Sequence, residues 1–281
     1  MLHGTFRLLK SKDAARFVAR QQRDPFVAMA RRDGYVCRSA YKLTAMDDKH
    51  GILSGANTAV IDLGSSPGGW SQVIRKRVGS EVDLFGVDLL VMQARLPGVK
   101  FVQGDFSSLQ VQRQLRSYFA QYDLVGHVDC VVSDMCPNRG PGDRGKSATL
   151  NENALLFATT MLRPGGNFVC KVLGGATEYP RVIEIAMAHF SSVHHEKPPA
   201  CRNESDESFL VAKSRLETPR NVGQIAAIGR AAAPPTSGGS VRAHGGAGAR
   251  SPHLRAMGNR VKPTPGAFGL DDWPGSARRP K

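Results

Sequence analysis

The sequence predicts an α/β fold of the Rossmann-like type, with a mostly parallel seven-stranded sheet and helices on both faces. Short apolar runs alternate with longer polar/apolar segments, as expected where strands alternate with helices. The first run, Ala59–Leu63, breaks into a glycine-rich turn before a helical pattern begins at Ser71. Four runs end on a carboxylate, and the carboxyl edge of such a sheet is where ligands bind.

The turn after the first strand has the composition of a nucleotide cradle. Glycine allows a sharp turn and a close approach of a ligand to the main chain, so Gly64, Gly68 and Gly69 are candidate cofactor contacts. Their spacing differs from the dinucleotide fingerprint G-x-G-x-x-G, and a purely structural turn is the alternative interpretation.

The acids at the strand ends predict the chemistry of the ligand. Any one of them could cap the helix or turn that follows, but four at one sheet edge favour a binding site. A pyrophosphate would be poorly matched to carboxylates, whereas the sulfonium, ammonium and ribose hydroxyls of S-adenosylmethionine suit them. The sequence therefore predicts an S-adenosylmethionine pocket whose candidate acids are Asp62, Asp88, Asp105 and Asp134.

A lysine interrupts the apolar strand Asn167–Leu173. Strands covered on both faces are apolar, so Lys171 needs a compensating partner. A structural ion pair with a neighbouring strand's acid is one interpretation. The other is a catalytic lysine beside Asp134 at the ligand edge.

Length and charge predict one catalytic domain between two basic segments. The 281 residues carry a formal net charge of +14, and residues 1–33 hold 8 basic against 3 acidic side chains. Residues 219–281 hold 10 against 2. Basic ends favour contact with a polyanion, with solubilising or targeting tails as the alternative.

The predicted domain boundaries follow composition. Residues 1–23 are a basic amphipathic segment, typical of either mitochondrial targeting or an RNA-contacting arm. Residues 24–216 are predicted to form the catalytic domain that contains the S-adenosylmethionine pocket. Residues 217–281 are rich in proline, glycine and alanine, and are predicted to be a disordered basic tail.

Two further segments are candidate RNA contacts. Arg38, Tyr41 and Lys42 lie in one predicted helical turn, which is either a solvated face or a surface for phosphates and bases. The loop Cys136–Lys146 brings Arg139 and Arg144 to the ligand edge. The five cysteines have no metal-ligand spacing, and no apolar run approaches membrane-spanning length, so neither a metal nor a membrane is expected.

With these motifs in place, the chain resembles the FtsJ/RrmJ (RlmE) family of ribosomal RNA 2′-O-methyltransferases, and within it the mitochondrial members. The resemblance covers roughly Asp24 to Arg215 and departs from the family at Ser65, Ser66 and Cys136. The segments that carry it are Arg38–Leu43, Asp62–Trp70, Val87–Leu90, Gln103–Phe106, Ser133–Asn138, Pro164–Gly166, Val169–Val172 and Glu207–Ala212.

The resemblance implies roles for particular residues. The family's Lys-Asp-Lys-Glu tetrad would fall on Lys42, Asp134, Lys171 and Glu207, with Lys171 as the base candidate. Trp70 joins the glycines and acids as an implied cofactor contact. The implied reaction is methyl transfer from S-adenosylmethionine to a ribose 2′-hydroxyl, with a uridine of large-subunit ribosomal RNA in a precursor particle as the expected target. A mitochondrial location is expected, with cytoplasm or nucleolus as the alternative.

Three other functions are compatible with parts of the sequence. A methyltransferase fold that serves as an RNA-binding assembly factor, its catalysis secondary or lost, is the main alternative; the intact tetrad argues against lost chemistry but not against a dual role. An NAD-dependent oxidoreductase lacks the fingerprint spacing and any evident hydride-handling residue. Methylation of a base amine is disfavoured, because the stretch Asp134-Met-Cys-Pro-Asn lacks the Asn/Asp-Pro-Pro-aromatic pattern of those enzymes.

Overall fold

The protein is described by a computed structural model for residues 18–137, 143–174, 179–221 and 223–225, with only the main chain at 143 and 144. One compact unit runs to Arg220 and a second begins at Asn221. The predicted tail begins slightly earlier, at residue 217. Most of the tail and residues 1–17 lie outside the described residues.

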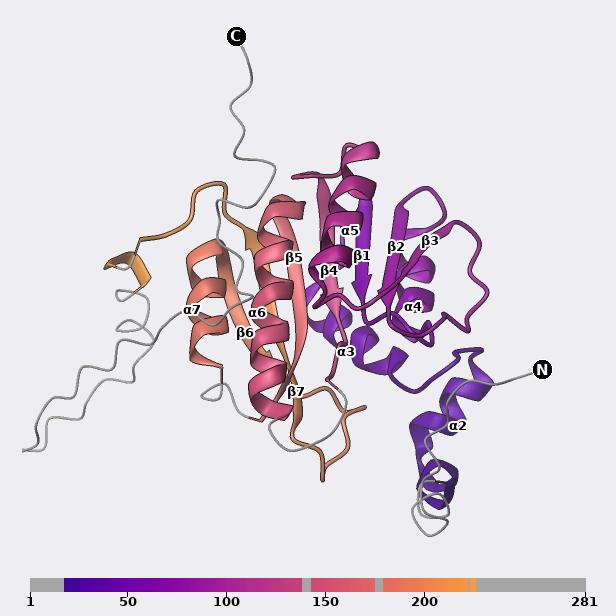
Figure 1. The fold of residues 1–281 in the computed structure, drawn as a ribbon. Helices are drawn as coiled ribbons and strands as arrows, with labels where there is room; N and C mark the ends of the chain where they lie inside the picture. Colours follow the sequence, from indigo (N-terminus) through magenta and orange to yellow (C-terminus); the bar gives the residue numbers. More distant parts are fainter. Residues whose placement is uncertain (1–17, 138–142, 175–178, 222, 226–281) are drawn as a thin grey trace, which may run out of the picture. The chain divides into compact units, whose positions relative to one another are not determined.

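A seven-stranded sheet forms the centre of the first unit, in the order β3-β2-β1-β4-β5-β7-β6 (Figure 1). β7 runs antiparallel to both of its neighbours, β5 and β6, and the other printed strand pairings are parallel. The predicted mostly parallel seven-stranded sheet is therefore confirmed. The strands are β1 (Ala59–Leu63), β2 (Asp83–Asp88), β3 (Val99–Gln103), β4 (Val128–Ser133), β5 (Leu162–Leu173), β6 (Phe190–Glu196) and β7 (Glu207–Arg215).

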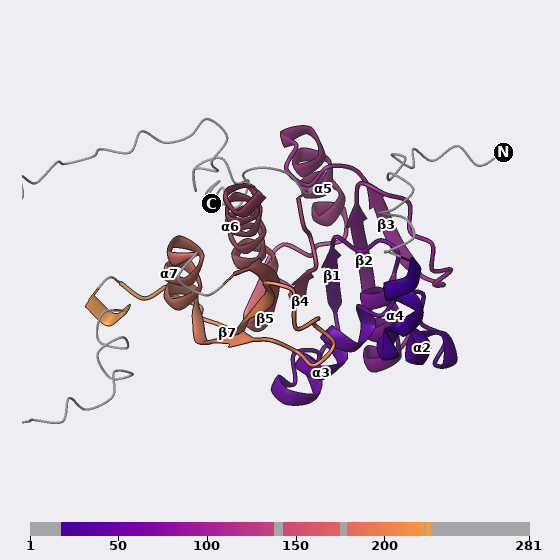
Figure 2. The ribbon, with the colours of Figure 1, turned by 90° about the horizontal axis from the view of Figure 1, so that it is seen from below.

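Helices cover both faces of the sheet. Figure 2 shows α3 (Ala40–His50) and α4 (Gly69–Val78) on one face, with α2 (Pro25–Arg32) beyond them. The opposite face carries α5 (Leu109–Gln121), α6 (Asp143–Met161) and α7 (Pro180–His189). Strands with both faces covered must be apolar on both sides, and all five residues of β1 are buried.

Two elements differ from the predicted bounds. The helix expected from about Thr149 begins at Asp143, inside the predicted loop. The helix can start this early because no proline interrupts the chain between Pro141 and Pro164. The predicted turn at 163–166 lies within β5. Leu162 pairs with Val128, and the next pair joins Asn167 to Cys130, so the turn residues form a bulge in a longer strand.

The strand order creates the ligand edge. β1 lies between β2 and β4, where the order of the sheet reverses, and a crevice at such a switch point is the usual binding site of this architecture. The glycine turn follows β1, and Asp134 follows β4 directly. The fold therefore brings these two predicted segments together at the carboxyl edge of the sheet.

Candidate active site

The glycine turn requires glycine at two positions. Gly64 has a φ of +79°, and a Cβ there would lie 2.8 Å from the main-chain nitrogen of Met135. Gly68 caps α4 with a φ of +115°, and a Cβ there would lie 2.4 Å from the Cβ of Ala94. Both conformations are costly for other residues. Gly69 begins α4, so the free N–H groups of its first turn lie at the carboxyl edge.

Two of the predicted acids hold the loops of this edge. Asp88 accepts the main-chain N–H of Ser66 at 2.9 Å and that of Leu90 at 2.8 Å. Asp105 lies beyond the end of β3 and accepts both the N–H and the hydroxyl of Ser107, at 2.8 and 2.7 Å. Each carboxylate oxygen has two lone pairs, so both acids retain acceptor capacity for a ligand.

Asp62 has a different environment. It lies inside β1, fully buried, and accepts the hydroxyl of Ser71 at 2.6 Å. Burial, together with the nearby charges of Asp134 and Asp88, raises the pKa of Asp62 to about 7. The carboxyl group of Asp62 is therefore divided between its protonated and charged forms near neutral pH.

Three buried oxygen atoms near this edge have no hydrogen-bond partner among the described residues: Asp62 Oδ1, Ser65 Oγ and Ser133 Oγ. A buried polar atom without a partner costs about 1–3 kcal/mol, and a ligand that completes the site is a common explanation. Acceptors beside a tight glycine turn fit a ligand with hydroxyl and cationic groups. These residues fit S-adenosylmethionine, which Gly64, Gly68, Asp88 and Asp134 would hold.

The side chain of Trp70 has a structural role, and we do not expect it to contact the cofactor. Its side chain is buried, donates its indole N–H to the carbonyl of Ser39 at 2.9 Å, and packs on Phe209 with the ring centres 5.7 Å apart. The indole thus joins α4 to α3 and β7. A cofactor contact from this residue would come from its main chain.

Lys171 and Asp134 form the first of two ion pairs. The Nζ atom of Lys171 donates to the Asp134 side chain at 2.9 Å and to its main-chain carbonyl at 2.6 Å. Ser133 and Cys170 are partners in the parallel pairing of β4 and β5, so the next residue on each strand lies at the same edge. The structure therefore brings Lys171 and Asp134 into direct contact, as both interpretations of this lysine require.

The same contact sets the charge of Lys171. Burial alone would lower the pKa of the ammonium group, but attraction to Asp134, with smaller contributions from Cys136 and Glu207, raises it above its ordinary value. The buried Asn151 of α6 donates to the main-chain carbonyl of Lys171 at 2.7 Å and fixes this part of β5. In this state Lys171 is protonated.

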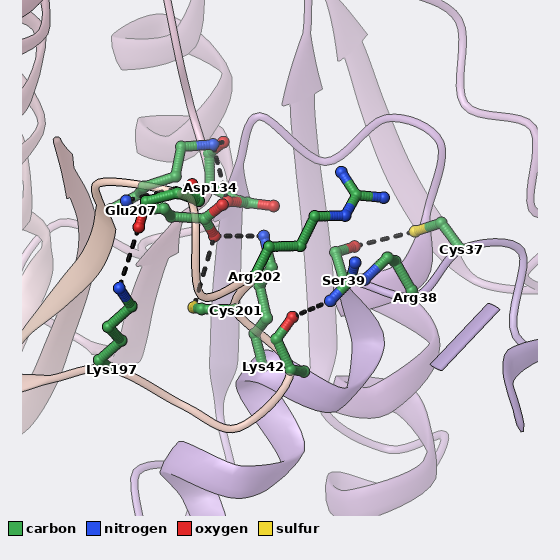
Figure 3. A network of polar contacts seen from close by, with 12 residues as sticks. Cys37, Arg38, Ser39, Lys42, Asp134, Lys197, Cys201, Arg202 and Glu207 are labelled. Atoms are coloured by element: carbon green, nitrogen blue, oxygen red, sulfur yellow. Dashed lines mark hydrogen bonds and ion pairs between the residues drawn. The ribbon is translucent and has the colours of Figure 1, made fainter. Parts of the chain in front are cut away.

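Lys42 and Glu207 form the second pair. Lys42 lies on α3 and donates to Glu207, which also accepts a weak hydrogen bond from the thiol of Cys201 (Figure 3). Because β7 is antiparallel, its first residue lies at the carboxyl edge, where Glu207 is opposite Leu173 of β5. The reversed strand thereby brings the last member of the tetrad to the same edge as Asp134.

A cleft of about 650 Å³ joins the two pairs. Lys42, Lys171 and Glu207 line it, together with three arginines: Arg20, Arg38 and Arg202. Three of the four tetrad residues thus line one cleft. The fourth, Asp134, is connected to the cleft by its hydrogen bond from Lys171. The arrangement can hold a polyanionic substrate with one of its hydroxyl groups near Lys171.

The predicted RNA contacts separate into three groups. Arg38 and Lys42 line the cleft. Tyr41 packs on Phe26 and Tyr35 and donates its hydroxyl to Asp33; burial, followed by that hydrogen bond, raises the pKa of Tyr41 to about 12. Arg139 and the side chain of Arg144 lie outside what the structure describes.

Three residues of the site escaped the sequence analysis. Arg20 belongs to the segment assigned to targeting or RNA contact, Arg202 precedes β7 in an irregular stretch, and Asn151 lies within a helix. For Arg20 the available signal was the basic amphipathic pattern of residues 1–23, whereas Arg202 and Asn151 belong to no such pattern. Over the described ranges, no helix is long and apolar enough to cross a membrane, and no group of three His, Cys, Asp or Glu side chains could hold a metal ion.

Comparison with known proteins assigns the fold to a family. The model of the FtsJ-like methyltransferases matches residues 35–215. The chain is 41% identical over 207 residues to "Ribosomal RNA large subunit methyltransferase E" of Granulibacter bethesdensis, covering 73% of this chain and 86% of that one. It is 40% identical to the protein of the same name in Erythrobacter litoralis, covering 73% and 90%.

A solved structure agrees with this assignment. The crystal structure of a protein described as a ribosomal RNA methyltransferase from Plasmodium falciparum superimposes with a TM-score of 0.54 at 26% identity, covering 66% of this chain and all of that one. The matched segment contains the glycine turn, all four acids at the strand ends and both ion pairs. The chain therefore belongs to the FtsJ-like methyltransferase family, and its methyl donor is S-adenosylmethionine.

Proposed function

We propose that this protein transfers a methyl group from S-adenosylmethionine to a ribose 2′-hydroxyl of large-subunit ribosomal RNA, with a uridine as the target. The observation that carries the proposal is the pair of lysine–carboxylate contacts, Lys171–Asp134 and Lys42–Glu207, at the cleft beside the cofactor turn. The names of the bacterial relatives support the same substrate class.

The chemistry explains why these residue types are needed. Methyl transfer to a hydroxyl is an in-line displacement, so the oxygen must be held in line with the methyl group while its proton is removed. S-adenosylmethionine supplies the methyl group and a positive charge. Lys171 is the proton acceptor, and Asp134 fixes the direction of its Nζ atom. Lys42 and Glu207, which line the same cleft, orient the ribose.

Lys171 must lose its own proton before it can accept another. Asp134 opposes this loss by raising the pKa of the ammonium group. A cation bound close to the lysine acts in the opposite direction, and the cofactor's positive charge is of this kind. The pKa of Lys171 is therefore expected to fall when the site is filled.

A single-turnover assay tests the proposal. The protein is mixed with labelled S-adenosylmethionine and a fragment of large-subunit ribosomal RNA, and the product is digested with alkali. A methyl group on the 2′-oxygen protects the adjoining linkage from cleavage, so the label should appear in alkali-resistant dinucleotides. Label on a base would contradict the reaction type. Absence of transfer to naked RNA and to precursor particles would contradict the proposal as a whole.

An assembly role is the second candidate. The arginines at the cleft would bind RNA whether or not a methyl group is transferred, so binding to a large-subunit precursor could be useful in itself. Complementation separates the two roles. A Lys171→Ala protein that restores normal ribosome assembly while the RNA stays unmethylated would make assembly the principal role.

The cellular location is also part of the proposal. The basic amphipathic composition of residues 1–23 supports a mitochondrial location, with cytoplasm or nucleolus as the alternative. Fusing residues 1–23 to a fluorescent protein provides the measurement. A diffuse or nucleolar signal would contradict mitochondrial targeting and favour an RNA-contacting arm.

A further inference from the structure

A second cleft adjoins the catalytic one. Its volume is about 610 Å³, and helical residues 19–23, the start of α2 and the segment before β7 line it. The two clefts share Arg20, Arg38, Arg202 and Glu204 in their walls. A chain bound at Lys171 can therefore continue into the second cleft without leaving the surface. The size is within the usual range for sites that bind small ligands or nucleotides.

The second cleft is basic. Four arginines line it, namely Arg20, Arg23, Arg38 and Arg202, against two acids, Asp24 and Glu204. Arg20 and Arg23 are exposed, and Arg202 is half-buried. A guanidinium group presents a rigid fork of N–H donors that matches phosphate oxygens, which a lysine does not. The lining thus matches the repeating phosphates of a nucleic acid strand.

Asp24 gives this cleft a fixed geometry. Its carboxylate is buried, caps α2 by accepting the N–H of Phe26 at 3.1 Å, and forms ion pairs with both Arg38 and Arg202. Arg38 also donates to the carbonyl of Ala200, and its guanidinium lies 5.6 Å from the centre of the Phe26 ring. One acid therefore ties the α2 segment, α3 and the segment leading to Glu207 into a single wall.

Much of this wall lies outside the family match. Residues 18–34 precede the matched segment, which begins at residue 35, so the match assigns no role to Arg20, Arg23 or Asp24. Arg23 lines the second cleft but is not among the residues that line the catalytic cleft. The second cleft is thus built partly by helical residues 19–23 and by the start of α2, which precede the segment that the family model matches.

We propose that the second cleft is a phosphate subsite, in which Arg20, Arg23 and Arg202 bind the RNA backbone next to the nucleotide whose ribose is at Lys171. This inference rests on the proposed RNA substrate and adds to it the path of the RNA chain along the protein surface. The RNA runs from the tetrad across Arg38 and Arg202 toward residues 19–23. Asp24 is a positioning residue that holds Arg38 and Arg202 in place.

The salt dependence of RNA binding tests the subsite. The full chain is titrated with a fluorescein-labelled single-stranded RNA of about 12 nucleotides at several salt concentrations. Each phosphate contact to a single strand contributes about 0.7 to the slope of log K against log salt. The double variant Arg23→Gln, Arg202→Gln should bind more weakly at low salt and lose about 1.4 from that slope.

Matched measurements separate this result from other causes. Arg113→Gln removes the same charge from an exposed site on α5, on the other face of the sheet, and should leave the slope unchanged. The affinity for S-adenosylmethionine should be equal in all variants. A wild-type slope in the Arg23, Arg202 double variant would overturn the subsite while leaving the methyl transfer reaction intact. Absence of salt-dependent RNA binding by the wild-type protein would overturn both.

Discussion

The two halves of the carboxyl edge use their acids in different ways. At the ends of β2 and β3, Asp88 and Asp105 accept main-chain N–H groups, which fix the loops and leave the negative charge available to a cation. Beyond β4 and at the start of β7, Asp134 and Glu207 are each paired with a lysine. The first half suits a positively charged cofactor. The second half is built of neutralised pairs and can move a proton.

Neighbouring charges extend this difference. Arg20, Arg38 and Arg202 stand around the lysine–acid pairs and give that half a positive surface for an RNA strand. The cofactor half has its glycine turn and buried serines instead. Asp134 belongs to both halves, since it pairs with Lys171 and would also contact the cofactor. Elsewhere, a substitution in one half should change one ligand and leave the other unaffected, and four predictions compare the two halves and their surroundings.

The largest effect is expected at Lys171. Lys171→Ala should lower the single-turnover rate of methyl transfer by a factor of about 10² to 10⁴ because the proton acceptor is lost. Lys171→Arg should fail similarly, since a guanidinium stays protonated. The wild-type rate should rise with pH, because the pKa of Lys171 is raised and its neutral fraction grows with pH.

The control for this prediction is Lys49→Ala. Lys49 is an exposed lysine of α3 that is also paired with a carboxylate, Glu196, so the variant removes a comparable ion pair outside the cleft. Its rate should be near normal. Cofactor affinity should be equal in all three variants. Near-normal rates for both Lys171 variants would show that another group accepts the proton.

The next effect concerns stability and Asp62. Its folded-state pKa of about 7 exceeds the ordinary value of 3.8, so the folded protein binds the proton more tightly than the unfolded chain does. This group therefore lowers the free energy of unfolding as pH rises from about 4 to 7, by at most about 4 kcal/mol. Asp62→Asn cannot titrate and should lose that pH dependence.

Urea unfolding of wild type and Asp62→Asn between about pH 4 and 8 provides the measurement. Glu81→Gln, at an exposed acid before β2, is the control and should retain the wild-type slope. Parallel curves for wild type and Asp62→Asn would mean that the pKa of Asp62 is ordinary in the folded protein.

A smaller effect is expected at Asp88. Asp88→Asn keeps an oxygen acceptor for the turn but removes the negative charge, and should weaken S-adenosylmethionine binding by about 1.5–3 kcal/mol. Asp83→Asn, at the other end of β2, should have no such effect, because Asp83 pairs with Lys100 on the surface. Calorimetric titration measures both. RNA binding weakened as much as cofactor binding would break the proposed separation of the two halves.

The smallest effects are expected beyond the sheet. A chain ended after Asn221 should keep its stability and its cofactor affinity, since the compact unit runs to Arg220. Ending it after Pro219 removes Arg220, which donates to the carbonyls of Met187 and Ser191 at 2.7 and 3.2 Å. The free energy of unfolding should fall by about 1–3 kcal/mol.

Arg220→Gln in the full chain is the matched variant for these truncations. It should reproduce the part of the destabilisation that comes from the side chain, because the main-chain N–H of residue 220 still donates to the carbonyl of Ala188. Cofactor affinity should again be unchanged. A loss of cofactor affinity after either truncation would make the tail part of the cofactor half. Thermal unfolding and the calorimetric titration used for Asp88 give both quantities.

The elements of the cofactor half could be predicted because they are local. An apolar run, a glycine turn and an acid at a strand end are read within a few residues, and parallel strands necessarily bring their carboxyl ends to one edge. Local patterns also predicted that Lys171 has a charged partner, because a lysine in a strand covered on both faces requires one. They misjudged the start of α6 and the extent of β5, where a bulge keeps the turn at 163–166 inside the strand.

Only the tertiary structure decided how distant residues combine. The contact between Lys42 and Glu207 joins α3 to the first residue of a reversed strand. The family resemblance grouped these two residues, but no local pattern in the sequence predicts their direct contact. Asp24, Arg38 and Arg202 likewise meet from three separate segments to form the second cleft. Sequence patterns fix the type and direction of each element through local periodicity. The partner of a charged side chain depends on strand order and helix packing, which arise from burial of the whole core.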